Sequence, residues 1–494
     1  MNGSQIVMLV ILLAYLALNV GLGLYFSRRQ AAAVDVEKRY FIGGRNITGF
    51  VLAMTTMATY LSVSSFISGP GAAGLTYGYA QTWIAAVQVP VTFMVLGVLG
   101  NKLALVSRRT GAVTVTGYLK ARYKSDALTI AISLLMVLFF VAQMVSQFTG
   151  GATLIQSITG LPYAGSLALF ASIVVIYTAF GGFTAVAVTD AIQGLVMCAG
   201  TFLLLFFVLR AGGGLAGIDA GLQANLPNVY DNLFAKYRPG TLLSFWVLVG
   251  FGTLGLPQTA VRAMSFRDTR ALHRAMWYGA VACAFVVVGM HLAGTWAGAL
   301  AGQESLPTSD YFIPAVVQRI MPVGFAGLFL AAPMAAVMST ADSLLLLASA
   351  AIVRDLWKGY VVRDNPQRLA VYNRFFPAAS VATTLALGIV TLLLALDPPD
   401  IIFFLNLFAL GGLECTFFWP LVGGLFWRHG NRLAAIASSV GGAAVYLVCH
   451  YHVKWGGVHA VVWGLLAGAL LYFGVGLATR RSHPMDADIL DKCF

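Results

Sequence analysis

Charge is scarce in this sequence. Only 10% of its 494 residues are Asp, Glu, Lys or Arg, whereas 59% are hydrophobic, and an ordinary soluble domain carries about 25% charged residues. Such a chain cannot cover a compact fold with polar surface, so most of its surface must contact lipid. No long polar stretch separates the apolar runs, which excludes a separate soluble domain of any size. The sequence therefore predicts one all-α polytopic membrane domain.

Cysteine and catalytic motifs are also lacking. The five cysteines form no CxxC pair and no metal-ligand spacing, and the sequence contains no HExxH motif and no phosphate-binding loop. His291 is a lone histidine in an apolar run, which makes a poor metal site. After the last apolar run only residues 479–494 remain, too few for a signalling domain. We therefore expect neither an enzyme nor a sensor, no catalytic residue, and no obligate protein partner.

Apolar segments are what the sequence has in abundance. A helix needs about 20 apolar residues to cross a bilayer, and the 53 glycines favour helices that pack closely in a membrane. The first apolar run has no basic segment before it and no cleavage site after it, so we interpret it as a retained helix. The thirteen predicted spans are residues 6–26, 48–73, 79–101, 126–156, 162–180, 188–210, 241–262, 275–300, 323–350, 371–396, 399–427, 433–450 and 457–478.

The net charge of +12 follows the positive-inside rule. If the N-terminus lies outside, alternate loops and the C-terminal tail, with Arg262 and the adjoining Arg374 counted among them, hold all but five of the 30 Lys and Arg residues. This predicts a cytoplasmic C-terminus in the inner membrane and argues against nucleic-acid binding. The five exceptions are Arg210, Lys236, Arg238, Arg319 and Lys454.

Two of the predicted spans are interrupted. The first contains SVSSFISGPGAAG (Ser62–Gly74) and the second GFGTLGLP (Gly250–Pro257), and Gly and Pro in a membrane helix free backbone groups that must line a cavity or be buried. One break alone would be a packing kink. Two breaks in corresponding positions indicate an inverted five-plus-five repeat with a mid-membrane site. We expect residues 1–47 to form a first transmembrane helix and a cytoplasmic loop, and residues 48–427 to form a ten-helix transport core with repeats 48–210 and 241–427. Two further helices at 428–478 and a cytoplasmic tail at 479–494 would follow.

Three segments carry a resemblance to a known family: YFIGGRN (Tyr40–Asn46), YTAFGGFTAVAVTDAIQG (Tyr177–Gly194) and AAPMAAVMSTADS (Ala331–Ser343). From about Tyr40 to Trp427 the chain resembles the sodium:solute symporters. The resemblance implies a LeuT-type fold with about 13 helices and solute uptake coupled to inward flow of Na+. FISGPGAA and NLFALGGLE resemble a pantothenate-transporting branch, so pantothenate is the expected solute. Proline or another carboxylate is the alternative, and a passive channel is a less favoured one.

The resemblance also implies a sodium site. Residues three and four apart share one face of a helix, so the oxygens of the AAVMST segment can converge on one ion. The alternative is that each hydroxyl bonds back to a carbonyl one turn earlier. The implied ligands are the carbonyls of Ala58, Leu61 and Ala336 and the hydroxyls of Ser339 and Thr340.

Three acidic residues lie inside predicted spans and away from the first two positions of a span: Asp190, Asp342 and Glu414. Ionisable groups in a membrane are costly and are candidates for function. In some members of the family a residue matching Asp190 helps to bind a further cation, so Asp190, Asp342 and Ser343 form a second cation site in one interpretation. In the other, Asp190 is an interfacial acid that caps a helix and pairs with a cytoplasmic Arg. Glu414 is expected to be a structural partner of a neighbouring helix.

The solute site is expected between the two breaks. Pantothenate carries a carboxylate, two hydroxyls and an amide, and the spans contain no Lys or Arg near mid-membrane. Half-helix N-termini would therefore hold the carboxylate, and polar side chains would form hydrogen bonds with the two hydroxyls and the amide. Each such side chain has an alternative role in joining neighbouring helices. The candidates are Ser62, Ser64, Ser65, Gln88, Gln147, Phe251, Thr253, Gln258, His291 and Asn406.

Overall fold

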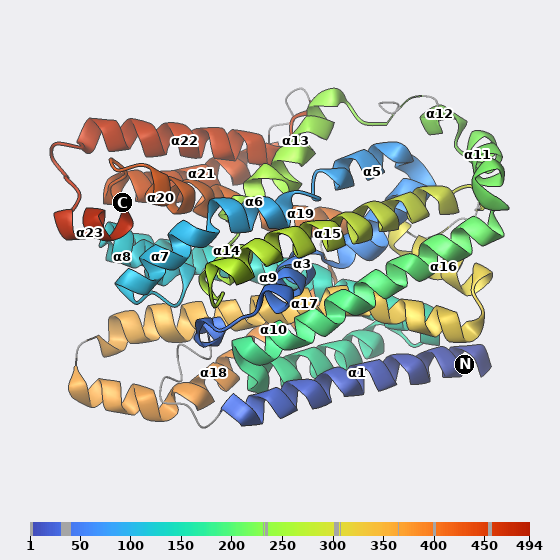
Figure 1. The fold of residues 1–494 in the computed structure, drawn as a ribbon, viewed down its shortest axis with the longest axis horizontal. Coiled ribbons are helices and arrows are strands. Elements are labelled where there is room, and N and C mark those ends of the chain that lie inside the picture. Colours follow the sequence, from blue (N-terminus) through green and yellow to red (C-terminus); the bar gives the residue numbers. More distant parts are fainter. Residues whose placement is uncertain are drawn as a thin grey trace.

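The computed structural model describes residues 3–30, 41–230, 232, 236–300, 306, 308–363, 365–398, 402–452 and 457–494. Over these residues the chain is helical, and its only β-type pairing is an isolated bridge between Ile47 and Phe266. The helices form one elongated bundle (Figure 1), as predicted. The long helices are α1 (Gly3–Gln30), α9 (Asp126–Thr159), α10 (Tyr163–Ala211), α15 (Thr269–Ala297), α17 (Val323–Ala350), α18 (Pro366–Ala395), α19 (Ile402–Phe418), α21 (Arg432–His452) and α22 (Ala460–Thr479).

Shorter helices complete the bundle and its ends. They are α5 (Tyr79–Ala86), α6 (Val91–Val98), α7 (Gly100–Thr110), α8 (Val115–Tyr123), α11 (Gly214–Asn225), α12 (Pro227–Tyr230), α16 (Phe312–Ile320), η7 (Ala351–Val362), α20 (Gly424–Phe426) and α23 (Ala487–Cys493). Within the described residues, ten helical segments are long and apolar enough to cross a membrane, and two more qualify when the halves of a bent helix are joined.

Helix α10 accounts for the remaining predicted span. It runs for 49 residues, more than twice what one crossing needs. Gly182 interrupts it with φ 66° and ψ 172°, a conformation that glycine adopts without steric cost. Predicted spans 162–180 and 188–210 therefore lie on the two sides of Gly182. The residues between them are otherwise helical, so a kink at Gly182 and not a loop separates the two spans.

Both predicted helix breaks are present. Helix α3 (Gly49–Tyr60) ends at Leu61, whose backbone is extended (φ −76°, ψ 118°), and the chain continues at a bend of 74° through η2 (Ser64–Ser68), α4 (Gly69–Ala72) and η3 (Ala73–Tyr77). Helix α13 (Pro239–Val249) leads through η4 (Phe251–Gly255) to Leu256, extended in almost the same way (φ −79°, ψ 120°). Helix α14 (Pro257–Ala260) follows at 47°. Each extended residue frees carbonyls that a continuous helix would use.

Helix α17 forms the centre of the bundle. It packs on α1, α3, α9, α10 and α18, and every residue from Phe329 to Ala350 is buried, whereas most residues of α18 are exposed or half-buried. The peripheral helices expose large apolar side chains such as Leu18 and Leu393, as helices that face lipid should. The polar groups of α17 are therefore removed from both water and lipid, and must find partners in the protein.

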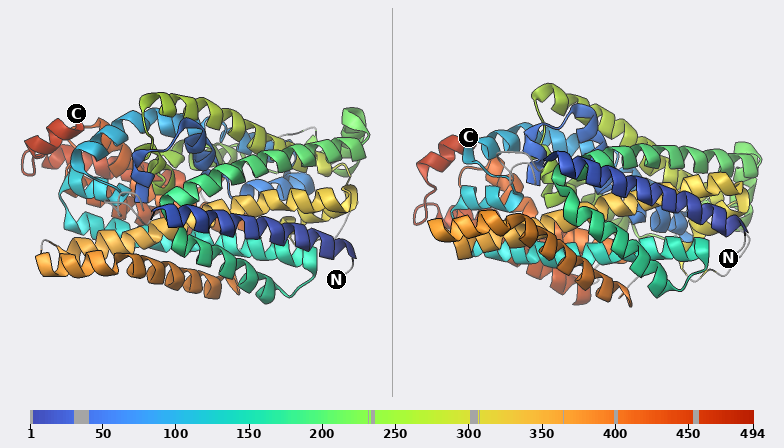
Figure 2. Two further views of the ribbon diagram at one scale, coloured as in Figure 1. Left: turned by 60° about the horizontal axis from the view of Figure 1, so that its bottom comes forward. Right: turned by 90° about the horizontal axis from the view of Figure 1, so that it is seen from below.

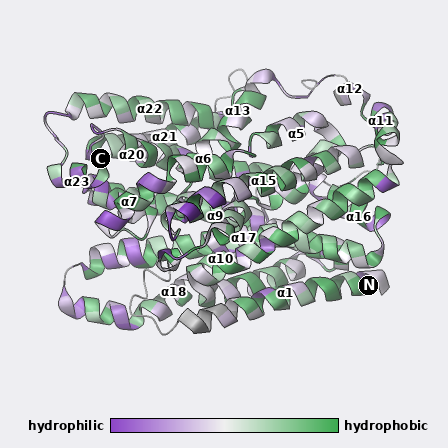
Figure 3. Ribbon diagram, viewed as in Figure 1, coloured by the Kyte–Doolittle hydropathy of each residue, from purple (hydrophilic) through white to green (hydrophobic). Residues whose placement is uncertain are grey.

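The two termini lie at opposite ends of the bundle (Figures 1 and 2). Hydrophilic residues gather at the end that holds the C-terminus (Figure 3). There Lys124 forms an ion pair with Asp486, just before α23, and this hydrogen bond lowers the pKa of the Asp486 carboxyl. The tail is thus attached to the bundle. Lys454 and Tyr40, used in the charge and motif arguments, lie outside the described residues.

Candidate functional site

The break after α3 lies against the middle of α17. The Ser339 hydroxyl donates to the carbonyl oxygen of Ala58 at 2.9 Å, and the Thr340 hydroxyl donates to that of Leu61 at 3.2 Å. Ser339 also lies 3.2 Å from the carbonyl of Ala336, one turn earlier. All five residues of the predicted sodium site are therefore adjacent, and none is more than 1% exposed.

This arrangement is compatible with both interpretations of the Ser339–Thr340 pair, the sodium site and the bond back to a carbonyl one turn earlier. Ser339 bonds back along its own helix, as any serine in an apolar helix does, and it also reaches across to the broken helix. The carbonyls of Ala58 and Leu61 are available because Leu61 leaves the helical conformation. Carbonyl and hydroxyl oxygens from an unwound helix and its neighbour are the ligands with which transporters bind Na+. These residues could hold such an ion, and the site stays a prediction.

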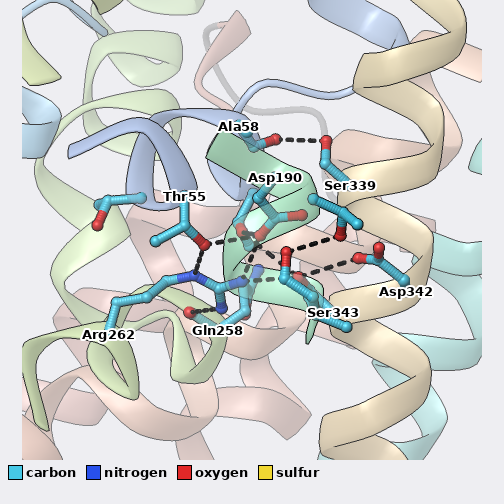
Figure 4. A network of polar contacts seen from close by, with 12 residues as sticks. Thr55, Ala58, Asp190, Gln258, Arg262, Ser339, Asp342 and Ser343 are labelled. Carbon is cyan, nitrogen blue, oxygen red and sulfur yellow. Dashed lines mark hydrogen bonds and ion pairs between the residues drawn. The ribbon is translucent and has the colours of Figure 1, made fainter. Parts of the chain in front are cut away.

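A buried ion pair lies beside this cluster (Figure 4). The Arg262 guanidinium is 3.2 Å from the Asp190 carboxylate, and the two side chains are 1% and 0% exposed. Arg262 also donates to the hydroxyl of Ser343 at 2.7 Å and to the carbonyl of Gln258 at 2.7 Å. The Thr55 hydroxyl donates to Asp190 at 2.7 Å. The network thus connects α3, α10, the second broken helix and α17.

Asp342 extends the network on α17. Its carboxylate accepts a hydrogen bond from Tyr177 at 2.6 Å and lies 3.3 Å from the hydroxyl of Ser343. Thr59 lies 3.4 Å from both Ser343 and Asp190. The predicted second cation residues are therefore linked, with Ser343 between the two carboxylates. Two carboxylates face one guanidinium here, so the ionised cluster would carry a net charge of −1.

Two expectations about this cluster were wrong. Arg262 was counted with the cytoplasmic loops, but it is buried between helices and is the positive charge of the site. Asp190 was placed near the start of its helix, but the helical segment begins at Phe183 and Asp190 lies about two turns inside it, fully buried. Asp190 does pair with an arginine, as one interpretation held, although it is not an interfacial cap.

A cavity opens between the first break, α5, α13, α15 and α19. Six of the predicted solute residues line it. The His291 ring donates through Nδ1 to the carbonyl of Val287 at 2.8 Å, which leaves Nε2 as an acceptor. The Asn406 amide donates to the hydroxyl of Ser62, 3.4 Å away. The six residues are Ser62, Ser64, Ser65, Gln88, His291 and Asn406.

The other four predicted solute residues do not line this cavity. Gln147 accepts a hydrogen bond from the backbone N–H of Val63 at 3.1 Å, so it satisfies the break itself. Thr253 bonds to the carbonyl of Gly250 within the second break. Gln258 belongs to the Arg262 network. Phe251 is 49% exposed, and its ring is tilted against that of the buried Phe418, so its predicted place in the wall of this cavity was wrong.

Sequence reasoning missed two polar residues of the cavity, Tyr60 and Gln81. The Tyr60 hydroxyl donates to the carbonyl of Val249, just before the second break, and Gln81 accepts a hydrogen bond from Tyr237 at 2.8 Å. Tyr60 precedes the extended Leu61, so its position was a usable signal. Gln81 carried no comparable signal. Among the described residues, neither Lys nor Arg lines the cavity.

Two broken helices that enclose buried polar sites define a secondary transporter. A model of the sodium:solute symporter family matches residues 40–442. The chain is 41% identical to the sodium/pantothenate symporter of Escherichia coli (strain K12) over 97% of this chain and 98% of that one. For the protein of that name from Haemophilus influenzae the identity is 40%, over 95% and 96%. For the osmoregulated proline transporter OpuE of Bacillus subtilis it is 27%, over 94% and 95%.

The fold has a close counterpart among solved structures. A substrate-bound, outward-open Na+-coupled sialic acid symporter superposes with a TM-score of 0.78 at 20% sequence identity, over 96% of this chain and 97% of that one. The LeuT-type fold is thereby confirmed. The chain belongs to the sodium:solute symporter family. It is a multi-pass transporter of the inner membrane and not an enzyme.

Proposed function

We propose that this chain takes up pantothenate by alternating access, driven by inward movement of Na+. The observation that carries the proposal is the contact of Ser339 and Thr340 with the freed carbonyls of Ala58 and Leu61. It provides a cluster of hard oxygen ligands between a broken helix and the central helix. The identity of 41% to a sodium/pantothenate symporter, against 27% to a proline transporter, supports pantothenate over proline.

The cavity has a chemistry suited to this solute. It presents hydroxyls, amides and the acceptor nitrogen of His291, which match the hydroxyls and amide of pantothenate. With no Lys or Arg in the described lining, the carboxylate would be held by backbone N–H groups of the first break. The transport core comprises residues 48–427, with inverted repeats 48–210 and 241–427. The N-terminus lies outside and the C-terminus in the cytoplasm, an assignment supported by the opposite positions of the termini (Figure 1).

Asp190, Asp342 and Ser343 form the second cation site of this proposal. The Arg262 guanidinium already balances one carboxylate of the pair. One negative charge remains, which a second Na+ would neutralise.

Uptake into proteoliposomes tests the proposed function. The purified protein takes up labelled pantothenate when Na+ is higher outside, and an equal K+ gradient gives no accumulation. Unlabelled pantothenate competes, whereas proline and sugars do not. Accumulation that ignores the Na+ gradient contradicts the symport mechanism, and competition by proline contradicts the assigned solute.

A further inference from the structure

Glu414 is a carboxyl group that the sites described above do not use. It lies on α19 and is fully buried. Neither of its oxygens has a hydrogen-bond partner among the described residues. A buried polar group without partners is costly, and an isolated buried charge is far more so. The side chain therefore lies in a setting that its neutral acid form tolerates and its carboxylate form does not.

The neighbouring titratable groups do not stabilise a charge on Glu414. Those that interact with it are Tyr60, Cys415 and Tyr446, and no described Lys or Arg does. The hydroxyls of Tyr60 and Tyr446 donate to the carbonyls of Val249 and Phe408, and the Cys415 thiol is directed at the carbonyl of Val461. Each of these three donors is thus engaged with a backbone carbonyl.

Glu414 also touches the second helix break. A Cβ atom added to Gly252 would lie 2.1 Å from a carboxyl oxygen of Glu414, so the backbone of η4 lies directly against this group. One turn further along α19, Gly255 packs against Phe418 in the same way, with a Cβ clash at 2.9 Å. The unwound segment and α19 therefore meet at two glycines, and the first of them covers the carboxyl.

We propose that Glu414 is a proton-binding site whose occupancy is coupled to the position of the second broken helix. With η4 packed on α19, the group holds its proton as a carboxylic acid. When η4 moves away and water enters, the O–H bond breaks, the proton passes to water and a carboxylate remains. Return of η4 to α19 requires the proton to be regained. The inference rests on the proposed function only in assuming that the broken helix moves during transport.

Carboxyl chemistry tests the protonated state without a transport assay. Dicyclohexylcarbodiimide adds to neutral carboxylic acids in apolar surroundings and leaves a stable acylurea that mass spectrometry locates. We expect modification of Glu414 in the lipid-reconstituted protein, decreasing as the pH is raised. In the infrared spectrum, Glu414→Gln should remove a C=O band of a protonated acid that the control Asp310→Asn, which removes a different buried carboxyl, retains. No modification at any pH, together with an unchanged band, overturns the proposal.

The pH dependence of uptake tests the coupling. At constant Na+, wild-type uptake should fall about tenfold per pH unit once the carboxyl ionises, because one proton is required in each cycle. Glu414→Gln, which mimics the neutral form, should flatten this profile, and Glu414→Asp should keep a sloping one. Identical profiles for the wild type and Glu414→Gln contradict the coupling. A wild type that takes up no pantothenate at any pH contradicts the proposed function instead, and the carbodiimide result still decides the state of Glu414.

Discussion

The Ser339 hydroxyl donates a 2.9 Å hydrogen bond to the carbonyl oxygen of Ala58, a residue 281 positions earlier in the chain. The bond joins the central helix α17 to the end of α3, just before that helix breaks. It links a rigid, buried helix to one whose halves are bent by 74°. An ion bound here would therefore hold the broken helix in one position relative to α17, which is how binding can favour one conformation over another.

Replacing Ser339 by alanine should weaken Na+ binding. Loss of one oxygen ligand of hydrogen-bond strength is worth about 1.4 kcal/mol, or about a tenfold rise in the Na+ concentration for half-maximal uptake. Na+ titration of pantothenate uptake measures this shift. The matched control is Thr391→Ala, because the Thr391 hydroxyl donates to the carbonyl of Leu387 one turn earlier within α18, away from the sodium site. An equal shift in both variants would show a general effect on the fold.

Asp342→Asn should lower the steepness of uptake against Na+ concentration. Arg262 pairs with Asp190, whereas among the described residues the hydrogen bonds to the Asp342 carboxylate come from the uncharged side chains of Tyr177 and Ser343. Asp342 therefore supplies the charge that a second Na+ would neutralise. A Hill analysis at saturating solute measures the change. Unchanged steepness in a variant that still takes up pantothenate would remove the second cation site.

Arg262→Met should destabilise the protein, because it leaves the Asp190 carboxylate buried without a counter-charge. Loss of one partner of a buried ion pair costs about 3–5 kcal/mol. The double variant Arg262→Met with Asp190→Asn removes both charges and should recover most of the loss. Thermal unfolding of the purified variants in detergent gives the comparison. A double variant no more stable than Arg262→Met alone would mean that the ion pair is not the cause.

The apolar runs and the positions of Gly and Pro predicted the membrane spans and both breaks, because about 20 apolar residues are needed for a span and Gly and Pro weaken or interrupt a helix. The partnership of Arg262 with Asp190 could not be predicted in this way. Arg262 ends its span and precedes a group of loop cations, so its charge looked cytoplasmic. Arg262 follows α14 by two residues, and only the packing of α14 against α3 and α17 shows that the Arg262 side chain is buried.

The candidate solute residues show a second limit. Those within the first break, and most of those on regular helices facing it, line one cavity. At the second break, Gly250 leaves the helical conformation (φ −116°, ψ −91°) and the 3-10 turn of η4 begins at the next residue. The direction of the Phe251 side chain therefore could not be predicted from the α-helical period of the residues before it.

Asn406 and Phe251 therefore make a sharp test of the solute cavity. Asn406→Ala removes an amide that lines the cavity and bonds to Ser62. The loss of a buried polar contact, about 1–3 kcal/mol, should raise the KM for pantothenate by about 5- to 150-fold. Phe251→Ala removes a larger side chain from the same region but outside the cavity, and should leave KM within about twofold because surface substitutions are usually worth less than about 0.5 kcal/mol. Initial rates of uptake at saturating Na+ give both values. A larger rise in KM for Phe251→Ala than for Asn406→Ala would place the solute against η4 instead of between the first break and α19.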